Sequence, residues 1–567
     1  MGSTPTRWPL LLTATLIVVL TVAVYFPSLK NGSVWDDFDL VTENPYLRSF
    51  SGMATLFETD LWTASAKREP SSFYRPLTMV TFWINAWIAG PSATSMRAGN
   101  VMVHATNALL LWLLLRRLLS PTRTLLSASI AGLWAVMAVN SEPVLWISGR
   151  FDPLTVTVAL GCMLANRLRS VWGTVFVVLL ATCGLFIKET FMGWLPLLFL
   201  DDVWLLGRHP KQSIGKAIGL AVVIGLNLVV RQAVGIPSLS VVAETGLATL
   251  AQSHLFTFVT LVPRAFIPMA LDPFHPYAPL PLGSNIVVGV LLAGLTGWFG
   301  WRGLRKESKP YQKISAFGWG WLVLGLFPAS LTGPNLFMIG DRYAYLPCLG
   351  LIMVVFAEAS AALERLRRLS TKARWFAGAV VAVAIVGQSW ALIRRIPDWK
   401  DDRSLAEASL RAHPNNPYAL YYLGYLAIGD NDLGRAEPLL VEAARGNPRC
   451  WRTANAICVL RLRQGRYREA QASCERSLAI HGDNPRAWVN LASVYVNEKR
   501  WLPALEASLE AVARKPFFPE ARYLAAVSYA NLGDLERARE QMDAGFAEEP
   551  KHPGLLDLQR QMDARQR

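Results

Sequence analysis

The sequence predicts an all-α protein with two parts, a polytopic membrane domain followed by an α-solenoid of short helical repeats. Of its 567 residues, 52% are hydrophobic and only 17% are charged, whereas a soluble chain carries about 25% charged residues. The apolar residues are concentrated before about residue 396, and the remainder is rich in Ala, Arg and Glu. We therefore expect a membrane domain over 1–396 and a second domain after it.

Eleven apolar runs are candidate spanning helices, because about 20 residues of helix cross the hydrocarbon layer. They cover residues 9–26, 97–117, 124–142, 151–167, 171–187, 190–206, 216–234, 284–301, 314–332, 343–363 and 374–393. Two further runs, 77–90 and 249–271, are expected to lie in the interface or to re-enter. The first is short, and Pro263 and Pro268 interrupt the second.

Lysine and arginine predict the orientation of these helices. They are concentrated in loops within residues 116–123, 167–169, 208–216, 302–313 and 365–374. Loops of this kind are cytoplasmic in membrane proteins, so the net charge of +15 reflects topology and predicts no nucleic-acid partner. Eleven crossings then place residues 27–96 in a first extracytoplasmic loop, and everything after 393 on the same side.

An acidic segment directly follows the first apolar run. Asp36, Asp37 and Asp39 stand there among Trp, Phe, Leu and Val. Such a cluster is often only a solvated loop. However, other charged residues at the ends of spans fall on the same predicted side, namely Arg75, Glu142, Arg150, Asp152, Lys188, Glu189, Asp341 and Arg342.

The second apolar run adds a polar face to this group. Arg97, Asn100, His104 and Asn107 recur at helical spacing from its outer end. Ionisable groups at membrane depth are costly and usually face a protein interior or a water-filled cavity. The sequence therefore predicts a polar chamber that opens outward. The alternative that Glu142–Arg150 and Lys188–Glu189 are simple interfacial ion pairs stays open.

The C-terminal part contains an internal repeat of 34 residues. It is marked by small residues in equivalent places, Ala436, Ala470, Ala504 and Ala538, and again Gly424, Cys458, Ala492 and Ala526. This spacing predicts four tetratricopeptide repeats over 415–553, after a linker at 397–414 and before a capping tail at 554–567. Such arrays usually bind proteins, although a purely supporting scaffold is the alternative. Cys458 and Cys474 fall on facing helices of one repeat and could bridge in an oxidising compartment, with two buried unpaired thiols as the alternative.

Taken together, these motifs resemble the transmembrane-and-tetratricopeptide-repeat family of O-mannosyltransferase-like proteins, within the GT-C glycosyltransferases that use polyprenyl-phosphate-linked sugars. The resemblance rests on Trp35-Asp36-Asp37, Tyr74-Arg75-Pro76-Leu77, His104-Ala105-Thr106-Asn107, Glu142-Pro143-Val144 through Gly149-Arg150 and Asp152, Lys188-Glu189, and Asp341-Arg342-Tyr343. Family members often carry histidines where this chain has Asn140-Ser141, and Glu where it has Asp341. These departures leave the sugar and the acceptor open.

The resemblance implies a hexosyl- or pentosyltransferase that moves a sugar from a polyprenyl-phosphate carrier to a hydroxyl group, on a protein, with inversion. It implies a catalytic base at Asp36 or Asp37, with Asp36 preferred. The donor phosphate would be held by Arg75, Arg342 and Lys188. The sugar or acceptor pocket would be lined by His104, Asn107, Glu142, Arg150, Asp152, Glu189, Asp341 and Tyr343. A phosphate is already a good leaving group, so one base suffices.

The remaining expectations concern cofactors, partners, cellular location and alternative functions. No cofactor and no metal are expected, although a divalent ion held by Asp36, Asp37 and Glu142 is the alternative that carboxylates allow. The partners expected are the lipid-linked donor, the bilayer and a protein that meets the repeats. We expect a multi-pass protein of the bacterial inner membrane, in preference to the endoplasmic reticulum, with its active site and repeats extracytoplasmic. The rival functions are transfer to a glycan or lipid, and a non-catalytic membrane-anchored scaffold.

Overall fold

The computed structural model describes residues 8–67, 71–119, 123–168, 170–236, 246–336, 338–366 and 371–566, and parts of the loops predicted to be cytoplasmic, 120–122, 169 and 367–370, lie outside them. The all-α prediction is confirmed. Within these residues the only β-structure is an antiparallel pair of two-residue strands, β1 (His275–Pro276) and β2 (Met338–Ile339). The chain divides into two compact units, Met1–Ala408 and Ser409–Arg567.

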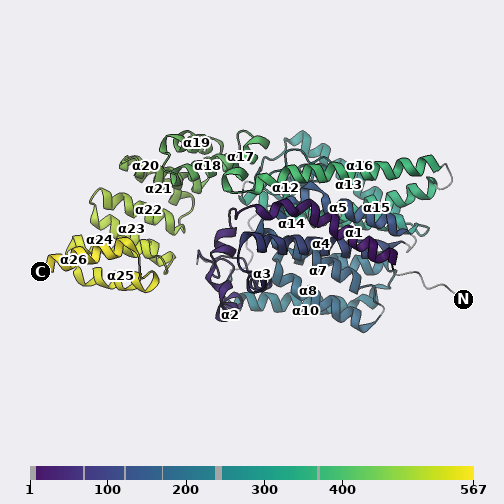
Figure 1. The fold of residues 1–567 in the computed structure, drawn as a ribbon, viewed down its shortest axis with the longest axis horizontal. Coiled ribbons are helices and arrows are strands. Elements are labelled where there is room, and N and C mark those ends of the chain that lie inside the picture. The colour runs from purple at the N-terminus through teal and green to yellow at the C-terminus, as the bar shows by residue number, and fades with distance from the viewer. Residues whose placement is uncertain are drawn as a thin grey trace. The chain divides into compact units, whose positions relative to one another are not determined.

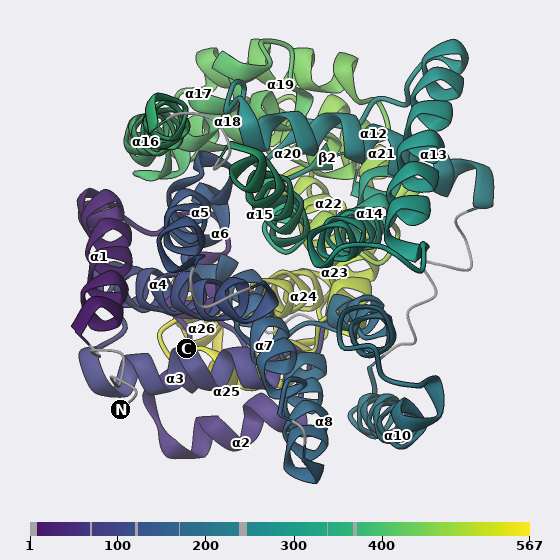
Figure 2. The same cartoon turned by 90° about the vertical axis from the view of Figure 1, so that its right-hand side faces the viewer.

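Long helices of the first unit run side by side (Figure 1). They are α1 (Trp8–Tyr25), α4 (Ala93–Leu118), α5 (Thr124–Val136), α7 (Phe151–Ala165), α8 (Val171–Ile187), α10 (Pro210–Ala233), α12 (Leu247–Phe266), α13 (Leu282–Leu304), α14 (Pro310–Leu336), α15 (Pro347–Leu366) and α16 (Thr371–Arg395). Seen end-on, α1, α10, α13 and α16 form part of the rim (Figure 2). Their exposed side chains are large and apolar, such as Leu16, Val290 and Val383, which suits a lipid-facing surface.

Seven helices in the described residues are long and apolar enough to cross a membrane. They are Trp8–Lys30, Ala93–Leu118, Pro210–Ala233, Leu282–Leu304, Pro310–Leu331, Pro347–Arg365 and Trp375–Trp399. The pair Thr124–Val136 and Ala138–Leu145 would make an eighth, bent by 52°. At the bend the Ala138 N–H donates to Gln388 Oε1 at 3.0 Å instead of continuing the helix. The expected spans at 151–167 and 171–187 are shorter helices, and 190–206 is divided into η7 (Glu189–Trp194), α9 (Pro196–Leu200) and η8 (Asp201–Leu205). Eleven crossings therefore stay a prediction.

The two remaining apolar runs are also helical. The run at 77–90 forms α3 (Pro76–Ala89), which is a shorter apolar helix of 14 residues. The run at 249–271 forms most of α12, with Pro263 inside it, and α12 is not among the seven candidate spans.

Short elements gather at the end of the first unit where α4 and α7 begin. They are η1 (Phe26–Lys30), η2 (Phe38–Thr42), η3 (Pro45–Arg48), α2 (Phe50–Glu58), η5 (Ala138–Asn140), α6 (Ser141–Leu145), η6 (Ile147–Arg150) and η9 (Asp341–Ala344). A small apolar core holds several of them together, in which Leu40, Leu56, Phe82 and Ile147 are buried. This core fixes the acidic segment against α3 and η6.

The second unit consists of helical hairpins. The pairs are α18 (Pro417–Gly429) with α19 (Leu433–Gly446), α20 (Trp451–Arg463) with α21 (Tyr467–Ile480), α22 (Pro485–Asn497) with α23 (Trp501–Arg514), and α24 (Pro519–Leu532) with α25 (Leu535–Glu548). They are followed by α26 (Pro553–Gln566). A Cβ on Gly424 would lie 2.7 Å from Leu440 Cγ, so the first hairpin needs its small residue.

Two further features bear on the predicted division. The 397–414 stretch, expected as a linker, is largely helical, in η10 (Ile396–Trp399) and α17 (Asp402–Ala412). Cys458 of α20 and Cys474 of α21 form a disulfide with a Cα–Cα distance of 5.2 Å.

Candidate active site

Asp37 anchors the acidic segment to a distant part of the chain. Its side chain is fully buried. The Ser148 N–H donates to Oδ1 at 2.7 Å, and the Val34 N–H donates to Oδ2 at 3.1 Å. Burial raises the pKa of Asp37 from 3.8 to about 6, although these two N–H donors lower it. Both carboxylate oxygens are thus used to hold the backbone in place.

Asp36, the next residue, is placed differently. Its side chain is 23% exposed, and its Oδ1 lies 3.9 Å from Lys67 Nζ. Lys67 also lies 3.1 Å from Asp39 and 4.2 Å from the centre of the Trp62 ring. Of the two candidate bases, Asp36 is therefore the one that solvent and a substrate can reach.

An aromatic wall begins at Trp35, directly before these aspartates. Its ring stacks on Trp146 at 5.2 Å and meets Phe274 edge-on at 4.9 Å. Its backbone is left-handed, with φ of 56°, which is uncommon for a bulky residue. The Trp35 N–H donates to Asp402 Oδ1 at 2.7 Å, which holds this conformation in place.

Arg342 lies against this wall. The centre of its guanidinium is 5.8 Å from the Trp35 ring, 5.4 Å from the Trp146 ring and 4.8 Å from the Tyr343 ring. Glu142 accepts two hydrogen bonds from it, one from the guanidinium and one from the Arg342 N–H at 2.9 Å. Burial alone lowers the pKa of Arg342, but the Glu142 carboxylate raises it above its ordinary value. The guanidinium therefore stays charged.

Two more cations continue the cluster away from Arg342. Lys188 Nζ lies 2.6 Å from Asp152 Oδ1 and 5.7 Å from the centre of the Tyr343 ring. The side chains of Lys188 and Asp152 are 9% and 11% exposed. Tyr343 therefore contacts both Lys188 and Arg342 and connects the two ion pairs.

Arg75 forms the third pair, with Glu189. Its Nε donates to Glu189 Oε2 at 3.0 Å, and a second guanidinium nitrogen donates to Oε1. The guanidinium lies 4.5 Å from the Phe151 ring, one residue before Asp152. Burial raises the pKa of Glu189, but the charge and hydrogen bonds of Arg75 lower it by more, so that the pKa is about 2. Three cations, each held by its own carboxylate, are thus connected through Tyr343 and the Phe151-Asp152 segment, and Arg342 is the one that lies against Trp35.

Comparison with known proteins adds to this picture. The chain is 24% identical over 583 residues to human "Protein O-mannosyl-transferase TMTC3", covering 93% of this chain and 58% of that protein. It is 23% identical to "Protein O-mannosyl-transferase F38B6.6" of Caenorhabditis elegans, covering 74% and 60%. This chain is similar to the TMTC proteins along most of its length. It spans about three fifths of the length of these curated relatives.

Further matches concern the repeats. The family described as "Tetratricopeptide repeat" matches residues 459–516. Among solved structures, the chain resembles the crystal structure of MamA, at 19% identity and a TM-score of 0.24, covering 26% of this chain and 87% of that one. It also resembles the tetratricopeptide-repeat protein YrrB, at 16% identity and a TM-score of 0.25, covering 35% and 97%. The recognition of the TMTC family and of the repeats is confirmed.

Several residues predicted to line the pocket lie in a buried layer behind it. His104 is fully buried, with Nδ1 at 2.6 Å from Tyr345 Oη and Nε2 at 2.8 Å from the Ala135 carbonyl oxygen. Asn107 donates to the Pro153 carbonyl oxygen and accepts from Thr157. These side chains are placed to position the wall of the site.

Arg150 and Asp341 belong to the same supporting layer. The Arg150 guanidinium donates to Asn100, to Asn85 and to the carbonyl oxygens of Thr81 and Met96. Asp341 accepts from His275 Nε2 at 2.8 Å and from the Asp272 N–H at 2.7 Å, which fixes the strand β1 segment beside η9. The alternative ion pair between Glu142 and Arg150 does not form, because Glu142 pairs with Arg342.

Two of the three carboxylates that the sequence offers as metal ligands, Asp37 and Glu142, already accept hydrogen bonds. Asp37 accepts two backbone N–H groups, and both Glu142 oxygens accept from Arg342. A divalent ion held by Asp36, Asp37 and Glu142 would have to displace these hydrogen bonds.

Sequence reasoning did not single out three residues that the structure places here. Trp146 stacks on Trp35, Phe151 lies under Arg75, and Lys67 contacts Asp36. Trp146 and Phe151 stand inside a recognised motif, and that was the available signal. Lys67 stands 31 residues after Asp36 in the 27–96 loop, and no periodicity marks it.

Proposed function

We propose that this chain is an integral membrane glycosyltransferase. It transfers a sugar from a polyprenyl-phosphate-linked donor to a hydroxyl group of a protein at the extracytoplasmic face, with inversion at the anomeric carbon. The observation that carries the proposal is the set of three carboxylate-held cations, Arg75, Lys188 and Arg342, beside the partly exposed Asp36. The names of the TMTC relatives, protein O-mannosyl-transferases, support the reaction class.

Asp36 acts as the base in this scheme. As the acceptor oxygen attacks the anomeric carbon, its proton passes to the Asp36 carboxylate, and the bond from that carbon to the phosphate oxygen breaks. Asp37 is unsuited to the task because backbone N–H groups occupy both of its oxygens. It instead ties the backbone next to Asp36 to Ser148 of η6. A single displacement from the face opposite the phosphate inverts the configuration.

The three cations receive the departing lipid phosphate. Glu189 occupies two of the three guanidinium nitrogens of Arg75, and Glu142 occupies one of those of Arg342. Each cation therefore keeps N–H groups for a phosphate oxygen. The Trp35–Trp146 stack provides an apolar surface next to them, which suits one face of a sugar ring.

The disulfide and the repeats support the proposed compartment and acceptor. A disulfide in the repeats suits an oxidising compartment, which agrees with the extracytoplasmic side and with the bacterial inner membrane that we favour. Tetratricopeptide arrays bind proteins, so the repeats would present the acceptor protein or a partner.

Asp36→Asn tests the proposal in the full chain. The variant should lose transfer at least about 100-fold, because an amide cannot take the proton, while its thermal unfolding temperature and its binding of the lipid-linked donor stay unchanged. Glu43→Gln, an exposed carboxylate of the same loop, is the matched control and should transfer normally. Product is measured by mass spectrometry of an extracytoplasmic protein acceptor. Normal transfer by Asp36→Asn would refute the role of Asp36, and absence of any transfer by the wild type with lipid-linked sugars would favour the scaffold.

A further inference from the structure

A second polar region lies at the other end of the same helices. Arg97 and Asp152 stand in the first turns of α4 and α7, on the side of the candidate active site. Arg117 is in the last turn of α4, and Arg167 follows α7. Twenty residues of helix rise about 30 Å, which is the thickness of the hydrocarbon layer. This region is therefore at the level of the opposite headgroups.

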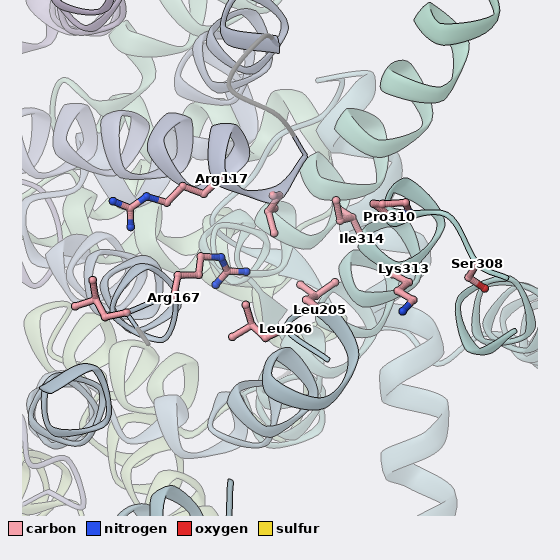
Figure 3. Close-up of a pocket in the computed structure, with 10 residues that line it drawn as sticks. Arg117, Arg167, Leu205, Leu206, Ser308, Pro310, Lys313 and Ile314 are labelled. Atoms are coloured by element: carbon pink, nitrogen blue, oxygen red, sulfur yellow. The ribbon is translucent and has the colours of Figure 1, made fainter. Parts of the chain in front are cut away.

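A cavity of about 570 Å³ opens there. It is lined by Arg117, Leu118, Arg167, Leu168, Leu205, Leu206, Ser308, Pro310, Lys313 and Ile314. Figure 3 shows that Arg117 and Lys313 come from different helices, that the Arg117 guanidinium points away from Lys313, and that the Arg167 guanidinium lies between them. Cationic and aliphatic side chains thus surround one space.

A buried network fixes one wall of this cavity. Asp201 and Asp202, at the start of η8, are fully buried. Arg167 pairs with Asp201 at 2.9 Å, while Arg208 and Lys216 pair with Asp202 at 2.7 and 2.6 Å. Because Leu205 and Leu206 follow Asp201 and Asp202 closely in the chain, the network fixes their positions in the wall of the cavity.

The charges in this region do not cancel. The network holds three cations and two carboxylates, which leaves one positive charge. Arg117 and Lys313 add two more, and within the described part of the chain neither forms an ion pair. An anion in the cavity would thus meet a net positive field.

We propose that this cavity binds the phosphate group of an anionic membrane lipid from the leaflet opposite the active site. Arg167, held by Asp201 between the other two cations, contacts the phosphate, and Arg117 and Lys313 flank it. The leucines and Ile314 contact the glycerol and the first methylenes of the acyl chains. A free nucleotide or inorganic phosphate shares the phosphate chemistry. However, the described residues of the lining include no aromatic ring for a base, and a tail-less ion would leave the apolar wall uncovered.

The test measures lipid retention by the full chain. Purified protein in a zwitterionic detergent is titrated with phosphatidylglycerol or phosphatidylcholine, and bound lipid is counted by native mass spectrometry. Phosphatidylglycerol should be retained in preference. Arg117→Gln combined with Lys313→Gln should weaken its binding about 30-fold, since each basic residue near an anionic headgroup contributes about fivefold. Arg305→Gln combined with Lys306→Gln removes two exposed cations of a neighbouring loop, outside the lining, and should have little effect.

Two further arms decide the source of the phosphate and the independence of the site. Inorganic phosphate and glycerol phosphate should not displace the lipid at equal concentration, and displacement by either would show a soluble ligand and overturn the proposal. Equal retention by both double variants would also overturn it. Asp36→Asn should retain phosphatidylglycerol normally, so that failure of this proposal and failure of the proposed transfer are distinguishable.

Discussion

The ion pairs inside the two units of this protein join residues at very different separations along the chain. In the first unit, Glu142 pairs with Arg342, 200 residues away, and Arg75 with Glu189, 114 residues away. In the repeat unit, ion pairs such as Arg522–Glu548 join residues 26 apart. The repeats are thus stabilised between neighbouring helices, whereas the candidate active site exists only once most of the first unit has folded.

This difference teaches where function and stability coincide. A buried pair between distant segments both completes the site and ties the fold together, so its loss damages both. A contact within one hairpin affects that hairpin alone. The changes below test this contrast, from the largest expected effect on stability to the smallest.

Glu142→Gln should cost about 3 to 5 kcal/mol of unfolding free energy, because it leaves the buried Arg342 without its carboxylate. It should also abolish transfer by releasing Arg342 from the aromatic wall. Thermal unfolding in detergent and the transfer assay measure the two effects. Glu364→Gln, which removes an exposed partner 3.9 Å from Arg123, is the control and should change neither. A stable Glu142→Gln variant would contradict the role of this pair.

Loss of the disulfide should act on the repeats alone. Cys458→Ser with Cys474→Ser, which opens a bridge across 16 residues, should destabilise the repeat unit by about 2 to 4 kcal/mol. Calorimetry of the full chain should then show a lower transition for the repeats and an unchanged one for the membrane unit. Cys450→Ser, a free cysteine in the same unit, is the matched control. A shift of both transitions would contradict the independence of the two units.

The raised pKa of Asp37 should make the stability of the protein depend on pH. Its folded pKa of about 6 lies above its ordinary 3.8, so the folded protein binds the proton more tightly than the unfolded chain does. The stabilisation is complete below about pH 3.8 and is lost as pH rises through 6, on the order of 3 kcal/mol in total. Unfolding measured from pH 4 to 7.5 should show this slope in the wild type and lose it in Asp37→Asn. An equal slope in that variant would assign it to other groups.

Lys67→Gln should change stability least. The ion pairs of Lys67 with Asp36 and Asp39 are about one quarter exposed, so their loss should cost less than about 1 kcal/mol. Transfer should nevertheless change, because the cation next to the proposed base is gone. Parallel measurement of unfolding temperature and initial transfer rate separates the two. Unchanged transfer would show that Lys67 does not act on Asp36.

The same contrast explains how much the sequence could predict. The repeats follow from a 34-residue period in small residues, since Gly424 and Ala436 pack within one hairpin. The recognised motifs also contain the residues that form the three ion pairs. Which partner each cation takes was not predictable, because Arg342 meets Glu142 only through the tertiary fold.

Burial explains why some residues predicted to line the pocket lie behind it. His104 is predicted on a polar helix face and Arg150 at the end of a span, and a sequence cannot tell whether such a residue faces a chamber or a carbonyl oxygen. In the fold, Ala135 and Tyr345 take both ring nitrogens of His104. The helix predicted at 124–142 is bent for a similar reason, because its Ala138 N–H donates to Gln388, which is far away in the sequence.

The matched charges around Tyr343 have one more consequence. Because Arg75, Lys188 and Arg342 each face a carboxylate, the region around Tyr343 presents almost no net charge to the surrounding water. Chloride, free phosphate and nucleotides gain little by entering it. In the proposed function, a donor with an isoprenoid tail gains additional binding free energy from the bilayer, so that its phosphate can use the N–H groups that these cations do not share with their carboxylates.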